Sequence, residues 1–302
     1  MWTEADIPDQ TGRTMVITGA NSGLGLRCSE VLSRKGARVL MACRSPERGA
    51  KALEQVGGKA ELVELDLADL ASVRAAAADI RERTGDAVDV LLNNAGVMAT
   101  PRSWTADHFE RQFGTNHLGH AALTWLLMPA LRTRPGARVV TVSSAGHRLG
   151  SLHVDDPNFE ARRYSAWLAY GQSKLANLLF TKALAKRAAG IDVTSVAAHP
   201  GLTGTDLGVN AARARGSAVL ERLIRVWDSI GTQSVEMGAL PLLYAATAPG
   251  VRPNDYYGPG GFQELRGHPA SASRSAAAQD DVAADRLWDL TATLTGVRPD
   301  PA

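Results

Sequence analysis

The feature that most constrains this chain is a regular alternation of short apolar runs with amphipathic stretches over its first 200 residues. The apolar runs are rich in valine and leucine and scarcely alternate with polar residues, which is typical of strands buried on both faces of a parallel sheet. The stretches between them have helical periodicity. The pattern therefore predicts an α/β fold, an open doubly wound parallel sheet with helices on both faces.

The expected elements can be placed by residue number. We expect strands at residues 14–18, 37–43, 60–67, 87–94, 137–144 and 192–199. We expect helices at residues 25–34, 46–55, 68–83, 106–131 and 166–188. After Pro200 the alternation fades: residues 202–230 contain an amphipathic piece, residues 268–285 predict a surface loop, and residues 286–294 predict a last helix.

Composition excludes several classes of protein. With 45% hydrophobic and 21% charged residues and a formal charge of +2, the 302-residue chain resembles an ordinary globular protein without an electrostatic footprint for nucleic acid. Two cysteines, Cys28 and Cys43, cannot form a disulfide framework and are expected in the core. The N-terminus lacks a signal-peptide pattern, and no stretch reaches the roughly 18 apolar residues of a membrane span. We expect a cytoplasmic protein without stable membrane insertion.

A glycine-rich stretch, TGANSGLG at residues 18–25, follows the first expected strand and leads into the first expected helix. Backbone N–H groups at such a junction can bind a phosphate. The spacing is G-x-x-x-G-x-G, however, and differs from the commonest dinucleotide fingerprint, G-x-G-x-x-G. On its own, this stretch leaves an ordinary tight turn open as an alternative.

Other polar features fall at the carboxyl ends of successive expected strands, at Cys43-Arg44, Asp66-Leu67, Asn93–Gly96 and Ser143-Ser144. Because the carboxyl ends of parallel strands meet at one edge of a sheet, these residues should border the same crevice as the glycine loop. Tyr170 and Lys174 follow on an expected helix, four residues apart, and therefore share one face of it.

These motifs resemble the short-chain dehydrogenase/reductase family, in the family's order over residues 12–206. The resemblance rests on TGANSGLG, NNAG, Asn116 in TNHLG, the serine pair, Tyr170-x-x-x-Lys174, and HPGLTGT from His199. MACRSPERG and SKLANLLFTKALAKR are similar to retinol-dehydrogenase-like and WW-domain-oxidoreductase-like members. The family implies a Rossmann-type fold, a nicotinamide cofactor and hydride transfer. We expect a single domain, 1–302, with a cofactor-binding and catalytic core at 12–200 and a substrate-binding part at 201–302.

The family resemblance also implies catalytic roles. Tyr170 would act as general acid in reduction and as general base in oxidation. A cation one helical turn away favours the phenolate, so Lys174 is expected to lower the pKa of Tyr170, and the resemblance implies that it also binds the nicotinamide ribose. Of the two serines, Ser144 rather than Ser143 would hydrogen-bond the substrate oxygen. Asn116 would complete a proton relay through a water molecule near Lys174.

The cofactor contacts are also implied by the resemblance. The residues of the glycine loop expected at the pyrophosphate are Gly19, Asn21, Ser22, Gly23, Leu24 and Gly25. At the end of the second strand, where an acidic residue would bind the ribose of NAD, this chain has Cys43 followed by Arg44. A guanidinium suits a 2′-phosphate, so NADP(H) is favoured over NAD(H).

The remaining contacts concern the two ends of the cofactor. Asp66 would accept a hydrogen bond from the adenine amino group, with Leu67 beside it, and Asn93 would touch the adenosine side. Thr205 would hydrogen-bond the nicotinamide carboxamide. The other residues expected at the cofactor, besides Tyr170 and Lys174, are Ala95, Gly96, Pro200 and Gly201.

Other residues could suggest different chemistry. His117 and His120 are three residues apart on a helix, but no third ligand is in evident reach, so we expect structural histidines and no metal. His147 and His153 lie in the loop after Ser144 and either border the substrate or are ordinary polar loop residues. Tyr164 is a rival tyrosine that lacks a lysine four residues on, and we reject it as the catalytic group.

The sequence thus predicts an NADP-dependent oxidoreductase that acts on a carbonyl or alcohol of a lipophilic small molecule. One alternative is carbon–carbon double-bond reduction, because GANSGLGL and SKLAN also resemble protochlorophyllide reductase. Another is an NADP-binding regulator without turnover. Residues 202–230 could form a lid over the substrate, pack as an ordinary helix, or touch a membrane surface. A homo-oligomer, either a dimer or a tetramer, is compatible with the family.

Overall fold

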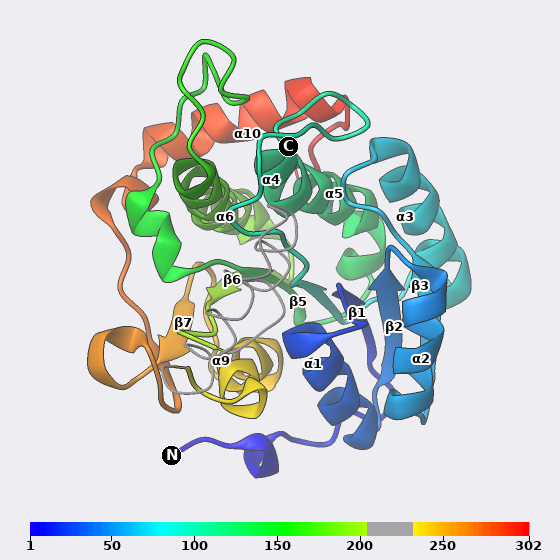
Figure 1. Ribbon diagram of the computed structural model, residues 1–302. Helices are drawn as coiled ribbons and strands as arrows, with labels where there is room; N and C mark the ends of the chain where they lie inside the picture. Colours follow the sequence, from blue (N-terminus) through cyan, green and yellow to red (C-terminus); the bar gives the residue numbers. More distant parts are fainter. Residues whose placement is uncertain (204–231, 302) are drawn as a thin grey trace.

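The computed structural model describes residues 1–203 and 232–301, and its strands form one eight-stranded sheet (Figure 1). The strand order is β3-β2-β1-β4-β5-β6-β7-β8. All neighbouring strands are parallel except β7 and β8. The strands are β1 Thr14–Thr18, β2 Arg38–Cys43, β3 Ala60–Glu64, β4 Val90–Asn93, β5 Ala137–Val142, β6 Val193–Ala198, β7 Tyr256–Pro259 and β8 Pro269–Ser271.

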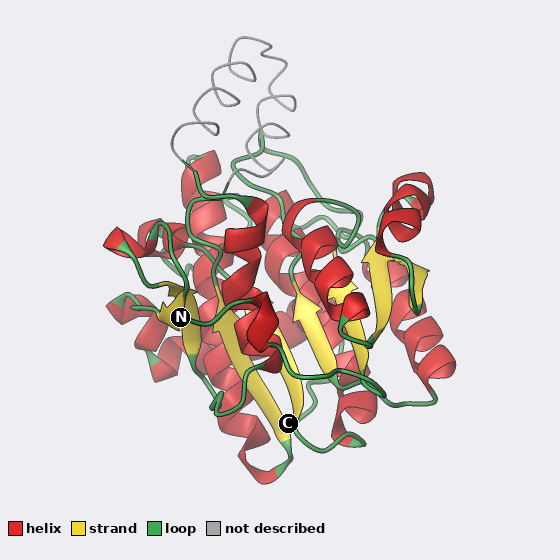
Figure 2. Cartoon of the chain, turned by 90° about the horizontal axis from the view of Figure 1, so that it is seen from below, coloured by secondary structure: helices red, strands yellow, loops and turns green. Residues whose placement is uncertain are grey.

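Helices cover both faces of this sheet (Figure 2). The helices are α1 Gly23–Arg34, α2 Pro46–Val56, α3 Leu70–Thr84, α4 Arg111–Phe113, α5 Gly119–Arg132, α6 Ala166–Arg187, α9 Val235–Thr247 and α10 Asp281–Thr295. Helices α1, α2 and α9 pack on one face and α3, α5, α6 and α10 on the other. The predicted doubly wound α/β fold is confirmed.

The strand sequences explain the two cores, because successive side chains of a strand point to opposite faces. In β1, Met15 and Ile17 join the core under α1 and α9, while Val16 joins the core under α3 and α5. All three are 0% exposed. This double burial accounts for strands that read as continuous apolar runs.

Helix ends follow local signals in the sequence. Helix α3 begins after Asp69, whose carboxylate accepts hydrogen bonds from the N–H groups of Ala71 and Ser72, and it ends at Gly85 in the left-handed conformation. Helix α2 begins after Ser45, with Pro46 in its first turn. These caps fix where each connection leaves the sheet edge.

The order of the strands positions the site. The chain runs outward from β1 to β3 and then returns to add β4 on the other side of β1, which creates a topological switch point between β1 and β4. In open α/β sheets, ligands bind beyond the carboxyl ends of the strands at such a point. The glycine loop after β1 and the NNAG stretch after β4 therefore flank one crevice.

The structure corrects several expected boundaries. The helix expected at 106–131 begins only at Arg111, because the chain before it turns back on itself: the His108 N–H bonds to the Thr105 carbonyl, and Glu110 pairs with Trp104 in an isolated bridge. Residues 268–285 do not form a plain loop, since they contain β8 and the start of α10, which begins at Asp281. Helix α9 and strand β7 were not predicted. Among the described helices, none has both the length and the apolar character needed to cross a bilayer.

Candidate active site

The glycine loop is a tight backbone cradle. A Cβ atom at Gly25 would lie 2.4 Å from the Gly19 carbonyl oxygen and 2.5 Å from the Asn94 side-chain nitrogen, so only glycine fits there. Gly19 itself has φ of +65°, in the left-handed region that favours glycine. The Thr18 hydroxyl accepts hydrogen bonds from the N–H groups of Asn94 and Ala95, both at 2.9 Å, and thereby ties the ends of β1 and β4 together.

The N-terminus of α1 faces the same crevice. Its N-cap residue, Ser22, makes no side-chain capping bond, in contrast to Ser45 of α2 and Asp69 of α3. The first N–H groups of a helix attract an anion when no side chain caps them. A cradle closed to any Cβ, next to such an uncapped helix, fits the pyrophosphate of a dinucleotide.

The end of β2 has the polarity expected for a 2′-phosphate. Arg44 is exposed directly after the strand. Cys43, which precedes it, is 2% exposed, and burial raises the pKa of its thiol to about 11, so it carries no charge at neutral pH. Together with the buried Cys28, this confirms the expectation of two core thiols.

Two residues expected at the adenosine end are partly engaged within the protein. The Asp66 carboxylate accepts a hydrogen bond from the Ala68 N–H at 2.9 Å. Asn93 is 1% exposed, and its side chain donates to the Thr124 hydroxyl of α5. The neighbouring Asn94 side chain instead donates to the Thr18 carbonyl at 2.8 Å. The Asn93 side chain is therefore engaged at its nitrogen, while its buried oxygen has no partner among the described residues. Asn94, to which the sequence gave no role of its own, holds the glycine loop.

Tyr170 and Lys174 lie one turn apart on α6 and are 7% and 4% exposed. The Lys174 ammonium is 5.8 Å from the centre of the Tyr170 ring and donates a hydrogen bond to the Val142 carbonyl at 3.1 Å. Burial lowers the pKa of Lys174 to about 8. The helix thus brings a cation and a phenol together at the carboxyl end of β5.

The pKa of Tyr170 is shifted in the direction opposite to the one expected. Burial raises it, and a hydrogen bond with the Ser144 hydroxyl only partly opposes that effect. The ring is enclosed because Gly146 lies against it, so that a Cβ there would be 2.9 Å from a ring carbon. A buried phenol without a closer cation keeps its proton, which favours the acid form.

The two serines after β5 differ in direction. Ser143 is 2% exposed, and its hydroxyl donates to the Lys174 backbone carbonyl at 2.8 Å. Ser144 is partly exposed, faces Tyr170, and accepts a hydrogen bond from the Gly146 N–H at 3.1 Å. Only Ser144 is placed to reach a substrate at the Tyr170 hydroxyl.

Asn116 lies in a short π-helix, Gly114–Leu118, between α4 and α5. Such irregular turns are frequent at functional sites. Its side chain bonds both the N–H and the carbonyl of Val97 and donates to the Ser173 hydroxyl. A Cβ at Gly96 would lie 3.2 Å from the Asn116 side-chain oxygen and 3.5 Å from the Lys174 ammonium nitrogen, so Asn116 and Lys174 border the same small space.

His117, His120 and Tyr164 have partners inside the protein. His117 bonds to the Thr291 hydroxyl and His120 to that of Thr18. Tyr164 bonds to the buried carboxylate of Glu110. Across the described part of the chain, no three histidine, cysteine, aspartate or glutamate side chains are grouped to hold a metal ion.

Thr205, which was expected at the nicotinamide carboxamide, lies outside the described residues. Nearly all of the 202–230 segment, which was expected as a lid, a packing helix or a membrane contact, also lies outside them.

The sequence reading did not assign a role to two residues near the crevice. His199 follows β6 and lies 3.1 Å from a carboxylate oxygen of Glu264. The position of His199 in the HPG stretch was a usable signal, but nothing in the sequence links it to a glutamate 65 residues later.

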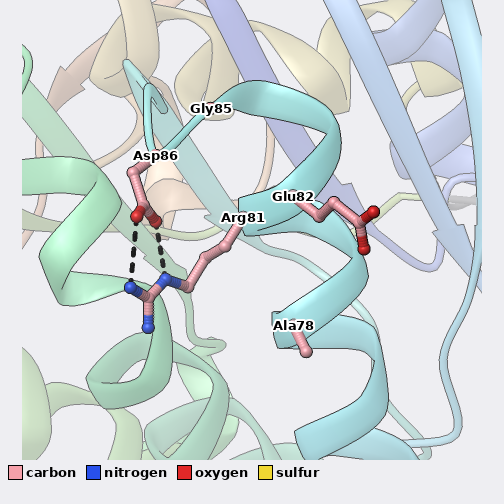
Figure 3. Close-up of a pocket in the computed structure, with 5 residues that line it drawn as sticks. All are labelled: Ala78, Arg81, Glu82, Gly85 and Asp86. Carbon is pink, nitrogen blue, oxygen red and sulfur yellow. Dashed lines mark hydrogen bonds and ion pairs between the residues drawn. The ribbon is translucent and has the colours of Figure 1, made fainter.

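A surface depression lies elsewhere, at the carboxyl end of α3 (Figure 3). It is lined by Ala78, Arg81, Glu82, Gly85 and Asp86. Its main feature is the Arg81–Asp86 ion pair, whose side chains are 39% and 44% exposed. Since this end of α3 leads to the amino end of β4, the depression is on the opposite edge of the sheet from Tyr170 and the glycine loop.

Comparisons with known proteins agree with this geometry. The family model for short chain dehydrogenase matches residues 13–216. Retinol dehydrogenase 13 of Homo sapiens is 38% identical over 300 residues, which covers 98% of this chain and 87% of the relative.

Solved structures give the same result. The crystal structure of an uncharacterized protein from Mycobacterium Paratuberculosis is 43% identical, with a TM-score of 0.82 and 98% of both chains covered. A protein from Beutenbergia cavernae, described as an NAD(P)-dependent gluconate 5-dehydrogenase and crystallised with NADP at low occupancy, is 30% identical. The match covers 80% of this chain and 92% of that one, with a TM-score of 0.59. The chain belongs to the short-chain dehydrogenase/reductase family of oxidoreductases and is retinol-dehydrogenase-like.

Proposed function

We propose that the protein is an NADP-dependent oxidoreductase that transfers a hydride between the nicotinamide and a carbonyl or alcohol of a lipophilic small molecule. The observation that carries this proposal is the buried pair of Tyr170 and Lys174, with the partly exposed Ser144 facing Tyr170, at the same sheet edge as the glycine cradle. A regulator that only senses the cofactor would need the cradle but not this group.

The chain offers a place for each part of the cofactor. The backbone of residues 19–25 would hold the pyrophosphate, and Arg44 the 2′-phosphate. The backbone cradle supports a dinucleotide. The end of β2 has Cys43 where an acidic residue would bind the ribose of NAD, and this supports NADP over NAD. Among the described residues, the Lys174 ammonium bonds only to the Val142 carbonyl, which leaves donors for the nicotinamide ribose.

The nicotinamide ring would supply or accept the hydride, and the protein's side chains would handle the proton. In reduction, Tyr170 donates its proton to the substrate oxygen as negative charge develops there. Ser144 donates a hydrogen bond to the same oxygen. The phenolate that remains on Tyr170 is stabilised by the Lys174 cation, and Asn116 holds the space beside that cation through Val97. Oxidation runs these steps in reverse.

The proposed substrate class rests on the surroundings of Tyr170. The Trp167 ring, 51% exposed, packs edge-on against the Tyr170 ring at 6.3 Å, and Leu168 beside it is 50% exposed. The exposed Trp167 ring presents apolar surface beside the Tyr170 ring, and this favours a lipophilic carbonyl compound. The curated relative named above acts, by its name, on retinol. A cytoplasmic location and a homo-oligomer remain expectations from the sequence.

The test is a titration followed by turnover. Purified protein is titrated with NADPH and with NADH by calorimetry, and then assayed with short polar and long apolar aldehydes and ketones. We expect tighter binding of NADPH and a kcat/KM that rises with the apolar length of the substrate. Failure to bind either cofactor, or binding without turnover of any carbonyl compound, would contradict the proposal.

A further inference from the structure

We propose that Glu264 is a positioning residue of the active site, because its carboxylate joins the turn after β6 to the turn after β5 and so sets the two relative to each other. The turn after β6 contains Pro200 and Gly201, and the turn after β5 contains Ser144. This inference rests on the proposed function, in which Ser144 of the second turn bonds the substrate oxygen. It adds that Pro200 and Gly201 of the first turn, which the sequence predicts at the cofactor, border its nicotinamide end.

One oxygen of the carboxylate orients His199. The imidazole Nε2 lies 3.1 Å from Glu264 Oε2, and its Nδ1 accepts a hydrogen bond from the Gly201 N–H at 3.2 Å. A ring nitrogen that accepts cannot carry the proton, so the proton is on Nε2 and is donated to Glu264. Burial lowers the pKa of His199 to about 4, which keeps the ring neutral in this tautomer.

The His199 ring has no freedom to shift. It is 0% exposed, and the backbone of Gly258 lies against it so closely that a Cβ there would be 2.0 Å from Nε2. The turn that follows is also fixed, since Gly201 has φ of +66° and the Leu202 N–H bonds to the Leu265 carbonyl at 2.9 Å. The carboxylate of Glu264 and the backbone of its neighbour therefore hold the turn after β6 at two points.

The other oxygen of the carboxylate holds the turn after β5 through residues 273–275. Glu264 Oε1 accepts hydrogen bonds from the N–H and the hydroxyl of Ser273, at 2.7 and 2.5 Å. The Arg148 guanidinium donates to that hydroxyl at 2.6 Å, and His147 accepts from the Ser275 N–H at 3.2 Å.

Arg148 and His147 belong to the 3-10 helix Ala145–Leu149, which begins directly after Ser144. The His147 ring also bonds to the Ser144 carbonyl at 2.7 Å. Residues 273–275 are therefore hydrogen-bonded to this short helix, next to the serine that faces Tyr170.

The backbone at Glu264 supports a positioning role. Gln263 and Glu264 both have positive φ, of +50° and +57°, although neither is glycine. Non-glycine residues in this region are strained and persist where the surroundings require them. The strained backbone places the Glu264 carboxylate between His199, 65 residues earlier in the chain, and Ser273, 9 residues later.

A positioning role for Glu264 predicts a selective defect that a general loss of stability would not produce. The glycine loop and Arg44 belong to other segments, so loss of Glu264 should disturb the nicotinamide end of the cofactor and spare the adenosine end. A ligand that has the 2′-phosphate and adenosine but lacks the nicotinamide, 2′,5′-ADP, reports on the second end alone.

The experiment compares Glu264→Ala and Glu264→Gln with a matched control, Glu61→Ala. Glu61 forms an ion pair with Arg38 on the neighbouring strand, at the amino side of the sheet. The readouts are the Kd values of NADPH and 2′,5′-ADP by calorimetry, and kcat and KM for the best carbonyl substrate. Circular dichroism and Tm show whether each variant is folded.

For Glu264→Ala we expect the Kd of NADPH to rise about tenfold, which corresponds to about 1.4 kcal/mol, while the Kd of 2′,5′-ADP stays within about twofold of wild type. A misplaced reacting group should also lower kcat, by about tenfold or more. Glu264→Gln keeps an oxygen for Ser273 but loses the acceptor for His199, so it should show the NADPH defect with a smaller loss of kcat. Glu61→Ala should behave as wild type.

Equal weakening of both ligands, or unchanged NADPH binding and kcat in both Glu264 variants, would overturn the inference. If Glu264→Ala does not fold, the isosteric Glu264→Gln alone gives the same ratio of the two Kd values. A wild-type protein that binds neither ligand would instead contradict the proposed function. Binding without turnover would contradict only its catalytic part, and the ratio of Kd values would still test Glu264.

Discussion

The two ends of the proposed cofactor site are built from different groups. The first end, for the pyrophosphate and the adenosine, consists mainly of backbone. Gly19 and Gly25, which have no side chains, pack against the end of β4, and the exposed Arg44 is the charged group. The catalytic end consists of buried side chains, Tyr170 and Lys174, whose pKa values are shifted by burial. The first end requires space and N–H donors, and the second requires particular protonation states. Substitutions should therefore act on binding at the first end and on turnover at the second.

The largest expected effect is that of Tyr170→Phe. Removing the hydroxyl removes the group that we propose as the proton donor to the substrate oxygen, and kcat should fall by about 10³-fold or more. The Kd of NADPH should change less than about threefold, since the ring remains in place. Steady-state kinetics and calorimetry measure the two quantities. Undiminished turnover would show that Tyr170 is not the acid, and a comparable loss of NADPH binding would remove the contrast between the ends.

Next in size is the difference between Ser144→Ala and its neighbour Ser143→Ala. Loss of a hydrogen-bond donor to a developing oxyanion costs about 10²–10³-fold in kcat, and this should follow Ser144→Ala. The Ser143 hydroxyl bonds within the protein to the Lys174 carbonyl, so Ser143→Ala should lower Tm by a few degrees, for about 1 kcal/mol, with a smaller loss of kcat. Kinetics and thermal melts of both variants check this, and the reverse order would exchange the roles of the two serines.

Much of the core could be predicted from the sequence, because its signals are local. Strands β1 to β6 were expected within three residues of their ends, since each is an apolar run bounded by turn residues. The helical period showed that Tyr170 and Lys174 share one face of a helix, and the family's motifs singled out the pair. Strand β7 could not be found in this way, because it has four residues that end in Gly258 and Pro259. Helix α9 has Pro241 in its interior, which weakens the helical pattern.

The parts of the site that depend on burial or on distant partners were not predictable. The sequence suggested a lowered pKa for Tyr170, but the direction depends on how deeply the phenol is enclosed, and Gly146 encloses it. The pairing of His199 with Glu264 depends on a strained turn with no sequence signature. The family's motifs thus supplied the candidate reacting groups, and only the tertiary structure gave the burial that shifts their pKa values and the hydrogen bonds that support them.

A smaller effect is expected at the adenosine end. Arg44→Asp replaces a partner of the 2′-phosphate with a like charge and should raise the Kd of NADPH about 30-fold, or about 2 kcal/mol. The Kd of NADH should change little, and kcat at saturating NADPH should remain near wild type. The exposed Arg298→Asp, near the C-terminus, makes the same change of net charge and serves as the control. Equal effects on both cofactors, or on Arg298→Asp, would show that Arg44 does not read the phosphate.

The smallest expected effect is a dependence on pH that originates at Lys174. Burial lowers the pKa of Lys174 to about 8, so the free enzyme loses the cation that stabilises the phenolate above that pH. The kcat/KM for reduction reports on the free enzyme and should decline above pH 8, by up to about tenfold per pH unit. The rate-against-pH profile measures this, and Lys174→Arg, which stays charged, should lack the decline. A profile that is flat to pH 9.5 in the wild type would contradict this role.

The stability of the fold should change with pH in the opposite direction. The unfolded chain keeps the Lys174 proton up to a pKa near 10.5, while the folded protein releases it near 8. Between these values unfolding takes up a proton, so the free energy of unfolding gains up to about 1.4 kcal/mol per pH unit from this group. Urea melts of wild type and Lys174→Met between pH 8 and 9.5 isolate that gain as a difference. If the difference is flat, Lys174 is not desolvated as the structure indicates. If the difference rises with pH while kcat/KM falls, the charge on Lys174 supports turnover and lowers stability. The backbone of the glycine cradle carries no titrating charge, so no such conflict between stability and function is expected there.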